Sequence, residues 1–554
     1  MSSGSCRSEV FSMQVYDYKV VRINADMNDG KVVLSAEGAL AAAAEPILKR
    51  INNVFREEKP ISVTDDSVIF STWVPPMPGP VFNRMINAEI GSSVLKKRTP
   101  DQISVGVTPR CPNKCAHCGA SDMMRPNSEM TVDEIINIID QGLDMGTYLV
   151  TIDGGEPMMR NDIPDIVSRI DKTKTTVSMF TSGFRLSEER AKALKEAGLY
   201  SVKVSFDSPD AEKHDAFRGR KGSFEDAVNA MKNARSAGLM TDLYLTISPY
   251  NIDRIDDLYS LACDLNASEM SMTGIIAVGN WKDHEDEVLT RSDAKRLEAF
   301  HRKINSEPGG PRVSALPYLL GPDMFGCFAG NRWMHIASTG DVLPCPYTPL
   351  TFGNIRNEPL ADIWEKMGNH PAYRKKSDVC LMRDPEFREK YIHTIPAGEK
   401  MPYPVYKLRS GIRLFFHPEQ IRFRRNFPKE ILPETRRSGK IPGQINTLTY
   451  SDGRLSFGYF YVLFFTGFPG IFIQPSSVFS HFSSAFICLS DLSFSHFSFS
   501  LSSVFRAVSC GLQFSSVMPV RIIPARIHKA VPFRMRFFHA GHHQAGCPEN
   551  VNKR

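Results

Sequence analysis

Cysteine is scarce in this chain of 554 residues, which contains 11 cysteines, an odd number. A thiol content this low excludes a small scaffold held together by disulfides. The first residues, MSSGSCRSEV, contain no apolar segment behind a charged start, so they do not resemble a secretory signal. We therefore expect a cytoplasmic protein in which clustered cysteines bind metal rather than form disulfides.

The chain has no uniformly distributed excess of positive charge, and it has no long apolar run. Its net charge is +6, but residues 406–554 carry 19 Lys+Arg and 6 Asp+Glu, whereas the residues before them carry 48 and 55. The basic excess belongs to the end of the chain, so we expect no nucleic-acid partner. An apolar stretch at 457–473 is short and interrupted by Gly and Pro, so we expect no membrane span.

The composition, 42% hydrophobic and 23% charged, is that of a globular protein with two or three cores, which excludes collagen, a coiled coil and a wholly disordered chain. Residues 406–554 differ from the rest. Residues 451–510 contain 15 Ser and 13 Phe without helical or strand periodicity. We interpret 406–554 as a low-complexity, disordered tail or an out-of-frame extension, with a membrane-surface anchor as the alternative.

Residues 1–98 are predicted to form a small N-terminal accessory α+β unit. Strands are expected at 18–24 and 31–35 around an Asn-Asp-Gly turn at 28–30, followed by a helix at 39–55. The run PPMPGP at 75–80 cannot form a helix or a central strand, so it is interpreted as a linker.

Residues 99–310 alternate strand-like and helix-like patterns. The expected strands are 103–108, 148–152, 176–180, 201–206, 241–247 and 269–276, and the expected helices are 131–143, 163–172, 188–197, 223–237 and 254–265. Thr131 followed by Glu134 fits a capping box at the first of these helices, and Cys263 is expected in the core. This repetition predicts an α/β fold, a partial (β/α)6 TIM-like barrel with its chemistry at the C-terminal ends of the strands.

The strongest chemical signal is a group of three thiols directly after the first predicted barrel strand. Cys111, Cys115 and Cys118 lie within eight residues. Three thiolates can hold a 4Fe-4S cluster and leave one iron open, which is typical of a catalytic rather than a structural metal site. A zinc knuckle is the alternative that spacing alone leaves open.

This C-x3-C-x-x-C pattern, with His117 before its last cysteine, resembles the signature of the radical S-adenosylmethionine (radical SAM) superfamily. The resemblance implies that the cysteines hold a 4Fe-4S cluster, that S-adenosyl-L-methionine binds its open iron, and that reductive cleavage yields a 5′-deoxyadenosyl radical that abstracts hydrogen from a substrate. It gives His117 a contact to the cofactor rather than the role of a base.

Further motifs resemble the same family in the same order and cover residues 100–305. Gly154, Gly155, Glu156 and Pro157 match its GGEP motif, which receives the amino group of the cofactor. Ser182, Ser205 and Asp207 match turns at the next two strand ends, and Arg218-Gly219 belongs to the run that usually follows. Paired glycines also permit a close backbone approach, and a carboxylate suits an ammonium group.

Residues 311–405 resemble the SPASM/twitch extension of this family. Cys327, Cys345 and Cys380 match its cysteines, which implies an auxiliary 4Fe-4S cluster. A full SPASM domain has more cysteines, so we expect a twitch-like or shortened form whose fourth ligand is a non-cysteine side chain or a position open for substrate. The alternative is three buried structural thiols.

The resemblance implies a radical SAM oxidoreductase or maturase supplied with electrons by a donor such as ferredoxin or flavodoxin. Relatives with this extension modify peptides or proteins, and others act on tetrapyrroles in alternative haem pathways. We expect peptide or protein maturation, with tetrapyrrole modification as the alternative enzyme and an iron–sulfur carrier or binding module as the non-enzyme alternative. The substrate is therefore a peptide or a small molecule.

Overall fold

The computed structural model describes residues 11–18, 20–28, 30–93, 96–124, 129–322, 324–408, 449–451 and 454–456. The chain separates into two units, Met1–Leu414 and Phe415–Arg554. In the second unit the described residues form an antiparallel hairpin of β18 (Thr449–Ser451) and β19 (Arg454–Ser456). The expected disordered tail lies outside the described residues, apart from 406–408 and this hairpin.

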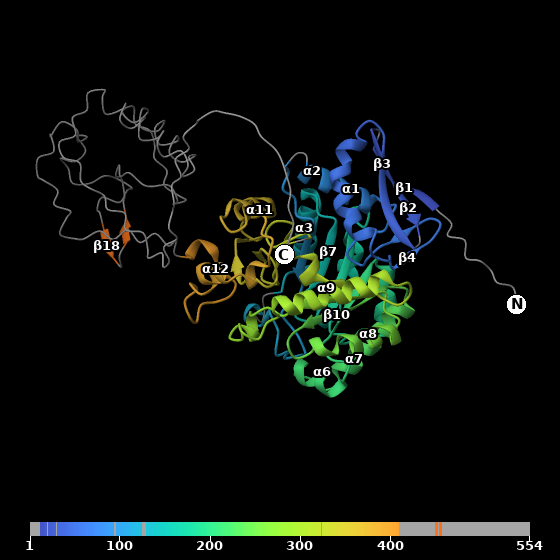
Figure 1. The fold of residues 1–554 in the computed structure, drawn as a ribbon. Coiled ribbons are helices and arrows are strands. Elements are labelled where there is room, and N and C mark those ends of the chain that lie inside the picture. Colours follow the sequence, from blue (N-terminus) through green and yellow to red (C-terminus); the bar gives the residue numbers. More distant parts are fainter. Residues whose placement is uncertain are drawn as a thin grey trace, which may run out of the picture. The chain divides into compact units, whose positions relative to one another are not determined.

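A ten-stranded sheet organises the first unit (Figure 1). Its consecutive parallel strands are β6 (Gln102–Gly106), β7 (Leu149–Asp153), β8 (Thr176–Thr181), β9 (Ser201–Phe206), β10 (Met240–Ile247), β11 (Glu269–Gly274) and β12 (Arg312–Ala315). The helices between them are α3 (Val132–Met145), α4 (Ile163–Arg169), α5 (Glu188–Glu196), α6 (Ala211–Arg218), α7 (Ser223–Ser236), α8 (Ile255–Asp264) and α9 (Arg291–Ser306). This alternation is the predicted partial barrel.

The predicted barrel elements agree with the structure because their hydrophobic patterns are strong. All residues of β6 are buried, as a near-continuous apolar run in a parallel sheet predicts. The capping box is confirmed, since Thr131 accepts a hydrogen bond from the Glu134 amide while the Glu134 carboxylate accepts one from the Thr131 amide. The expectation for Cys263 was wrong: it is exposed, because Ala262 lies on the buried face of α8 and the next residue turns away from it.

The sheet extends beyond the predicted strands at both edges. At one edge β12 follows α9, and at the other β13 (Trp333–Ile336) runs parallel to β6 and pairs antiparallel with β14 (Asp341–Leu343). The other elements of this segment are β15 (Leu350–Thr351), β16 (Gly353–Asn354), β17 (Tyr403–Pro404), α10 (Leu316–Leu319), α11 (Leu360–Asn369), α12 (Pro385–Phe387) and a short 3-10 turn, η5 (Leu381–Arg383). The cysteine-bearing C-terminal segment thus continues the barrel sheet.

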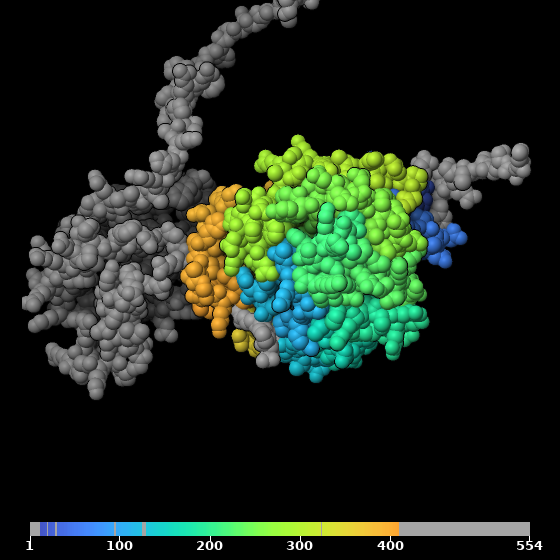
Figure 2. All heavy atoms as spheres, turned by 90° about the horizontal axis from the view of Figure 1, so that it is seen from below, coloured from blue at the N-terminus to red at the C-terminus, as the bar shows by residue number. Residues whose placement is uncertain are grey.

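This C-terminal segment packs against the barrel loops. Arg388 donates to the carbonyl of Ala277 over 3.0 Å and pairs with Glu285 at 2.6 Å. In the space-filling view its orange residues lie beside light-green residues of the loop before α9 (Figure 2). Among the described residues, no helix has the length and apolarity needed to cross a bilayer.

The described residues of the N-terminal unit form five strands, where two were predicted. Strands β1 (Phe11–Tyr18), β2 (Val21–Asn28) and β3 (Lys31–Glu37) form an antiparallel sheet, and the predicted hairpin joins β2 to β3. Helix α1 (Ala41–Phe55) follows as predicted, and a short hairpin of β4 (Ser62–Val63) and β5 (Val68–Ile69) leads to α2 (Pro80–Ser93).

The segment between β5 and α2 closes one end of the barrel. Met77, within the Pro-rich run, is fully buried and exchanges backbone hydrogen bonds with Val68. The hydroxyl of Ser71 donates to Glu269, and that of Thr72 lies 2.7 Å from a carboxylate oxygen of Glu269 and 3.1 Å from one of Asp242. These residues attach the N-terminal unit to the interior of the barrel, so the Pro-rich run is not a free connection.

Candidate functional site

A cavity of about 1230 Å³ extends through the barrel toward the C-terminal segment. Most of the predicted site residues line it, namely Cys111, Cys115, His117, Cys118, Gly154, Gly155, Glu156, Ser182, Ser205, Cys327, Cys345 and Cys380. Pro157 and Asp207 are not among its lining residues. The structure therefore brings the two predicted cysteine sets to one cavity.

The loop that follows β6 carries the first cysteine set. Backbone hydrogen bonds of 2.9 Å from Lys114 and Ala116 to the end of α6 hold this loop in place. Burial raises the pKa of the Cys111 thiol to about 12 and that of Cys115 to about 11. Such thiols stay protonated at neutral pH unless a metal replaces the proton, so cluster binding would release protons.

The surroundings of this loop fit an iron–sulfur cluster and its ligand. Three buried polar atoms near the thiols have no hydrogen-bond partner among the described residues: Nδ2 of Asn113, Nδ1 of His117 and Oδ1 of Asp207. Buried polar atoms without partners are rare and indicate a group that would satisfy them. No set of three or more Cys, His, Asp or Glu in the described part of the chain is arranged to hold a single metal ion.

The two glycines of the GGEP motif pack against the backbone that leads to Cys111. Gly154 has a φ of 134°, and a methyl group there would lie 2.6 Å from the carbonyl oxygen of Thr108. A methyl group on Gly155 would overlap the carbonyl of Arg110, whose oxygen accepts a hydrogen bond from the Glu156 amide. Glycine is required here because β7 must approach the cysteine loop closely.

Glu156 joins the ends of β7 and β8. Its carboxylate accepts hydrogen bonds from the Thr181 hydroxyl at 2.7 Å, from the Ser182 amide at 2.7 Å and hydroxyl at 2.6 Å, and from the Met158 amide at 3.0 Å. Burial raises the pKa of Glu156, although these hydrogen bonds oppose the shift. The carboxylate thus fixes two strand ends at the cavity wall.

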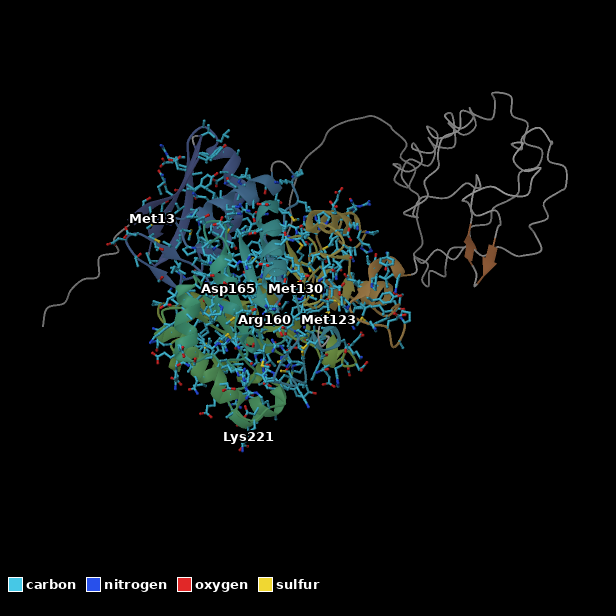
Figure 3. All side chains as sticks on the ribbon, turned by 180° about the vertical axis from the view of Figure 1, so that it is seen from behind. Met13, Met123, Met130, Arg160, Asp165 and Lys221 are labelled. Atoms are coloured by element: carbon cyan, nitrogen blue, oxygen red, sulfur yellow. The ribbon has the colours of Figure 1, made fainter. Side chains whose placement is uncertain are left out.

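Arg160 holds the segment after the GGEP motif against the barrel. Its guanidinium donates to the carbonyl oxygens of Val107 at 3.0 Å and Met130 at 2.8 Å, and Arg160 and Met130 lie beside each other in Figure 3. This residue therefore ties the end of β6 to the start of α3.

Asp207 acts behind the cavity wall through Arg218. The Arg218 Nε atom lies 2.5 Å from Oδ2 of Asp207, and its Nη1 atom lies 3.9 Å from the sulfur of Cys115. Burial alone would raise the pKa of Asp207, but the adjacent guanidinium keeps it below its usual value. Arg218 lines the cavity. The sequence places it in a motif that resembles the family, but did not indicate it as a site residue.

His117 is neutral in this environment. Its Nε2 atom lies 3.6 Å from Asp207, and its ring stacks on Phe217 with centroids 4.8 Å apart. Burial lowers the pKa of His117 to about 4. A neutral, stacked ring suits contact with a cofactor rather than proton transfer, as the resemblance implied.

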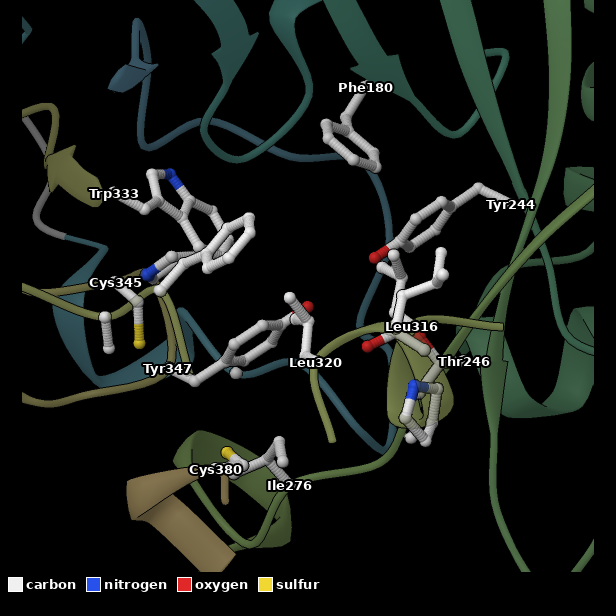
Figure 4. A pocket seen from close by; sticks show the side chains of 18 of the residues that line it. Phe180, Tyr244, Thr246, Ile276, Leu316, Leu320, Trp333, Cys345, Tyr347 and Cys380 are labelled. Carbon is white, nitrogen blue, oxygen red and sulfur yellow. The ribbon is translucent and has the colours of Figure 1, made fainter. Parts of the chain in front are cut away.

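The second cysteine set lies at the end of the cavity formed by the C-terminal segment (Figure 4). A hydrogen bond from Cys380 lowers the pKa of the Cys327 thiol to about 7, whereas burial raises that of Cys345 to about 11. The Cys345 sulfur lies 3.2 Å from the Thr348 hydroxyl. Three neighbouring thiols are suitable donors for an auxiliary cluster.

Aromatic side chains occupy the space between the two cysteine sets. Figure 4 shows Tyr347 between Trp333 and Cys380, and Tyr244 beside Phe180, with which it forms an edge-to-face pair. Tyr347 also lies beside the first cysteine set, because a methyl group on Gly119 would be 3.5 Å from its ring. The sequence did not indicate these residues, since inward-facing positions of barrel strands and isolated loop tyrosines have no distinctive spacing.

Asp153 and His335 form a polar pair in the same cavity. Their side chains approach within 3.7 Å, and Nδ1 of His335 lies 2.9 Å from the Ser104 hydroxyl. Burial raises the pKa of Asp153 to about 7 and lowers that of His335 to about 4. Asp153 directly precedes Gly154, so an acid with a near-neutral pKa lies next to the predicted cofactor site.

Comparisons with protein families agree with this geometry. The model of the radical SAM superfamily matches residues 105–262, and that of an iron–sulfur cluster-binding domain, SPASM, matches residues 327–391. These ranges contain the first and the second cysteine set respectively. A radical SAM domain uses a 4Fe-4S cluster and S-adenosyl-L-methionine, and a SPASM domain binds auxiliary iron–sulfur clusters.

Curated relatives include enzymes with two different substrates. An AdoMet-dependent heme synthase of Nitratidesulfovibrio vulgaris is 28% identical over 295 residues, which are 49% of this chain and 80% of the relative. The heme synthase of Methanosarcina barkeri is 29% identical over 53% of this chain and 87% of its own. A PqqA peptide cyclase of Granulibacter bethesdensis is 26% identical over 50% of this chain and 76% of its own.

Among solved structures, Streptococcus suis SuiB bound to S-adenosylmethionine is similar at a TM-score of 0.43 and 16% identity, covering 64% of this chain and 88% of that one. The named relatives are enzymes, and the two family domains lie in the order that the cysteine sets predict. The chain is a radical SAM enzyme with a C-terminal SPASM domain.

Proposed function

We propose that the cavity between the two cysteine sets is the reaction chamber of this enzyme. The observation that carries the proposal is that Cys111, Cys115 and Cys118 open into the same cavity as Cys327, Cys345 and Cys380. A substrate in the middle of this cavity would lie between a catalytic and an auxiliary cluster. We also propose that residues 1–98 are an accessory unit, 99–310 the barrel, 311–405 the auxiliary-cluster region and 406–554 a tail.

The chain's own residues bind and orient the reactants in this proposal. When bound, the cluster and S-adenosyl-L-methionine supply a 5′-deoxyadenosyl radical. Cys111, Cys115 and Cys118 would hold the cluster, and the cofactor would bind against His117 and the wall formed by Gly154, Gly155 and Glu156. Ser182, Ser205 and Arg218 line the same space, while Asp207 orients Arg218. Burial within the barrel excludes water from the radical.

Peptide or protein maturation is the substrate class we propose first. The cavity extends from the N-terminal unit, at Arg50 and Phe55, to Cys380 and Pro385 in the C-terminal segment. Such a long space suits a chain, and the similarity to PqqA peptide cyclases supports this choice. Tetrapyrrole modification is the second candidate, supported by the similarity to heme synthases. Electrons would come from a carrier such as ferredoxin or flavodoxin.

An anaerobic reconstitution experiment tests the reaction chamber. We expect about eight irons per chain, as two four-iron clusters require, and release of 5′-deoxyadenosine after addition of dithionite and S-adenosyl-L-methionine. Cys118→Ala should abolish this release, whereas Cys380→Ala should reduce the iron content. Cys263→Ala is the matched control, because Cys263 is exposed and outside the cavity lining.

The contrary result would be iron without cofactor cleavage under any reductant, which would favour an iron–sulfur carrier. The substrate is tested next by incubating the loaded enzyme with peptides encoded near the gene and with porphyrin precursors, and by mass spectrometry of the products. A mass change confined to the porphyrins would replace the peptide proposal by the tetrapyrrole candidate.

A further inference from the structure

Arg383 differs from the other cationic side chains deep in the cavity. Arg218 pairs with Asp207, and Arg312 and Arg332 each pair with two carboxylates. Arg383 also lines the cavity, but no carboxylate of the described residues lies within 4.0 Å of its guanidinium. Within the described part of the chain its side chain makes one hydrogen bond, a long one of 3.3 Å to the carbonyl of Leu289.

The position of Arg383 lies between the barrel and the second cysteine set. It ends η5, three residues after Cys380. A methyl group on Gly274, at the end of β11, would lie 3.3 Å from both terminal nitrogens of Arg383. The guanidinium is therefore at the carboxyl edge of the sheet, where substrates of parallel barrels bind. Burial lowers the pKa of Arg383, and the neighbouring Cys380 and Asp293 oppose this shift without reversing it.

Two further cations lie in the cavity lining on the adjacent helix. Arg291 and Lys295 are exposed, are one helical turn apart on α9, and have no ion-pair partner among the described residues. Three acids lie nearby: Glu298 is neutralised by Arg302, whereas Asp293 caps α9 through Thr290 and Asp384 accepts from the Glu386 amide, so both keep their charge. The three cations Arg383, Arg291 and Lys295 still exceed the two unpaired carboxylates by one charge.

We propose that Arg383 binds a carboxylate of the substrate, with Arg291 and Lys295 attracting that carboxylate toward the cavity. A guanidinium offers a planar pair of donors that matches a carboxylate, and a desolvated pair of this kind is specific as well as strong. This inference rests on the proposed reaction chamber and adds the chemical class of the substrate. The carboxylate could belong to a peptide or to the propionate of a tetrapyrrole.

Binding of two matched probe pairs to the reconstituted holoenzyme tests the proposal. The first pair is a porphyrin with free propionates and its methyl ester, followed by absorbance. The second is a peptide rich in Glu and its Gln counterpart, followed by calorimetry. We expect one acidic probe to bind better than its neutral partner, and Arg383→Gln to weaken that probe about tenfold or more. Arg383→Lys should retain part of the affinity.

Matched variants separate this site from general charge effects. Arg296→Gln is the control, because Arg296 lies on α9, pairs with Asp253 and is outside the cavity lining; it should leave binding unchanged. Arg291→Gln with Lys295→Gln should slow association and reduce its salt dependence. If Arg383→Gln does not fold, the affinity of Arg383→Lys and the association rate of the Arg291→Gln, Lys295→Gln double variant provide the measurement.

Three results would overturn the proposal. The first is equal affinity of the acidic and neutral probes, or no saturable binding of either acidic probe to the wild type. The second is unchanged acidic-probe affinity in Arg383→Gln. The third is loss of auxiliary iron in that variant with unchanged probe binding, which would show that Arg383 stabilises the thiolates of the second cysteine set and does not bind the substrate. Arg383-dependent binding without 5′-deoxyadenosine release would instead contradict the proposed reaction and leave the carboxylate site standing.

Discussion

Individual buried charges around the cavity are stabilised by specific partners, and this makes their removal costly. The pair of Arg218 and Asp207 is almost completely buried, with side-chain exposures of 9% and 2%. In such a pair the mutual attraction compensates for lost hydration. The two residues also connect α6 to the loop of Cys115, so the pair maintains the geometry of the first cysteine set.

Asp207→Asn should lower the free energy of unfolding by about 3 to 5 kcal/mol, because it leaves the Arg218 cation buried without its counter-charge. Urea denaturation measures this change. Asp226→Asn is a suitable control: Asp226 pairs with Arg220 at the same 2.5 Å distance but is 34% exposed, so about 1 kcal/mol or less is expected. Equal losses in the two variants would contradict the role assigned to burial.

Asp153 should make stability fall as pH rises. Its pKa of about 7 in the folded chain exceeds the value of about 4 in an unfolded chain. The folded state therefore keeps a proton between pH 4 and 7 that the unfolded state releases, and stability is lost progressively up to pH 7. His335 has a pKa of about 4, so it stays neutral over most of this range.

Asp153→Asn should remove this contribution. Relative to the wild type it should be little changed at pH 4 and more stable by up to about 4 kcal/mol at pH 8. Denaturant midpoints across this pH range provide the measurement, and His335→Gln serves as the control that should keep the wild-type slope above pH 5. Parallel curves for Asp153→Asn and the wild type would show that Asp153 does not titrate in this range.

At the scale of elements, strong local patterns were predictable and distant pairings were not. The barrel strands and α3 with its capping box follow from apolar runs and local hydrogen bonds, which the sequence displays directly. Strands β12 and β13 are only four residues long and join the sheet through partners far away in the chain. Nothing in their local sequence specifies those partners, so the continuity of the sheet was missed.

The candidate site shows the same division. The cysteines and the GGEP motif were predictable because their spacing is local. Arg383 was not, because its significance depends on the absence of an anionic partner in three dimensions. Tyr347 was missed for a similar reason, since only the fold places it beside Gly119.

Helix α3 depends on its capping box, which also connects it to the C-terminal segment. Glu134 pairs with Arg356 at 2.6 Å as well as capping α3. Thr131→Ala should lower the free energy of unfolding by about 1 kcal/mol, because the Glu134 amide loses its acceptor. Thermal or urea unfolding measures this loss. Thr131→Ser keeps the oxygen and should differ from the wild type by a few tenths of that value; if it matched Thr131→Ala, the cap would not be the cause.

For the whole molecule, the N-terminal unit and the barrel share one buried polar network. Lys203, Asp242, Glu269 and Arg312 lie side by side on adjacent strands from β9 to β12. The Thr72 hydroxyl accepts a hydrogen bond from Lys203, lies within hydrogen-bond distance of both carboxylates, and so completes this row from outside the barrel. The row is fully buried, so its charges depend on that completion.

Truncation from the two ends should therefore have opposite results. A chain ending at Leu414, the boundary of the first unit, should keep its iron content and its 5′-deoxyadenosine release, because both cysteine sets and the cavity lie before that residue. A chain starting at residue 99 should lose both, since Asp242 and Glu269 would lose Ser71 and Thr72, and each uncompensated hydrogen bond costs about 1 to 3 kcal/mol.

Thr72→Val isolates this effect without deleting the unit and should destabilise the full chain in the same direction. Iron per chain, product release and urea unfolding measure these outcomes. An active chain lacking residues 1–98 would show that the network is dispensable. An inactive chain ending at Leu414 would show that the reaction requires residues 415–554.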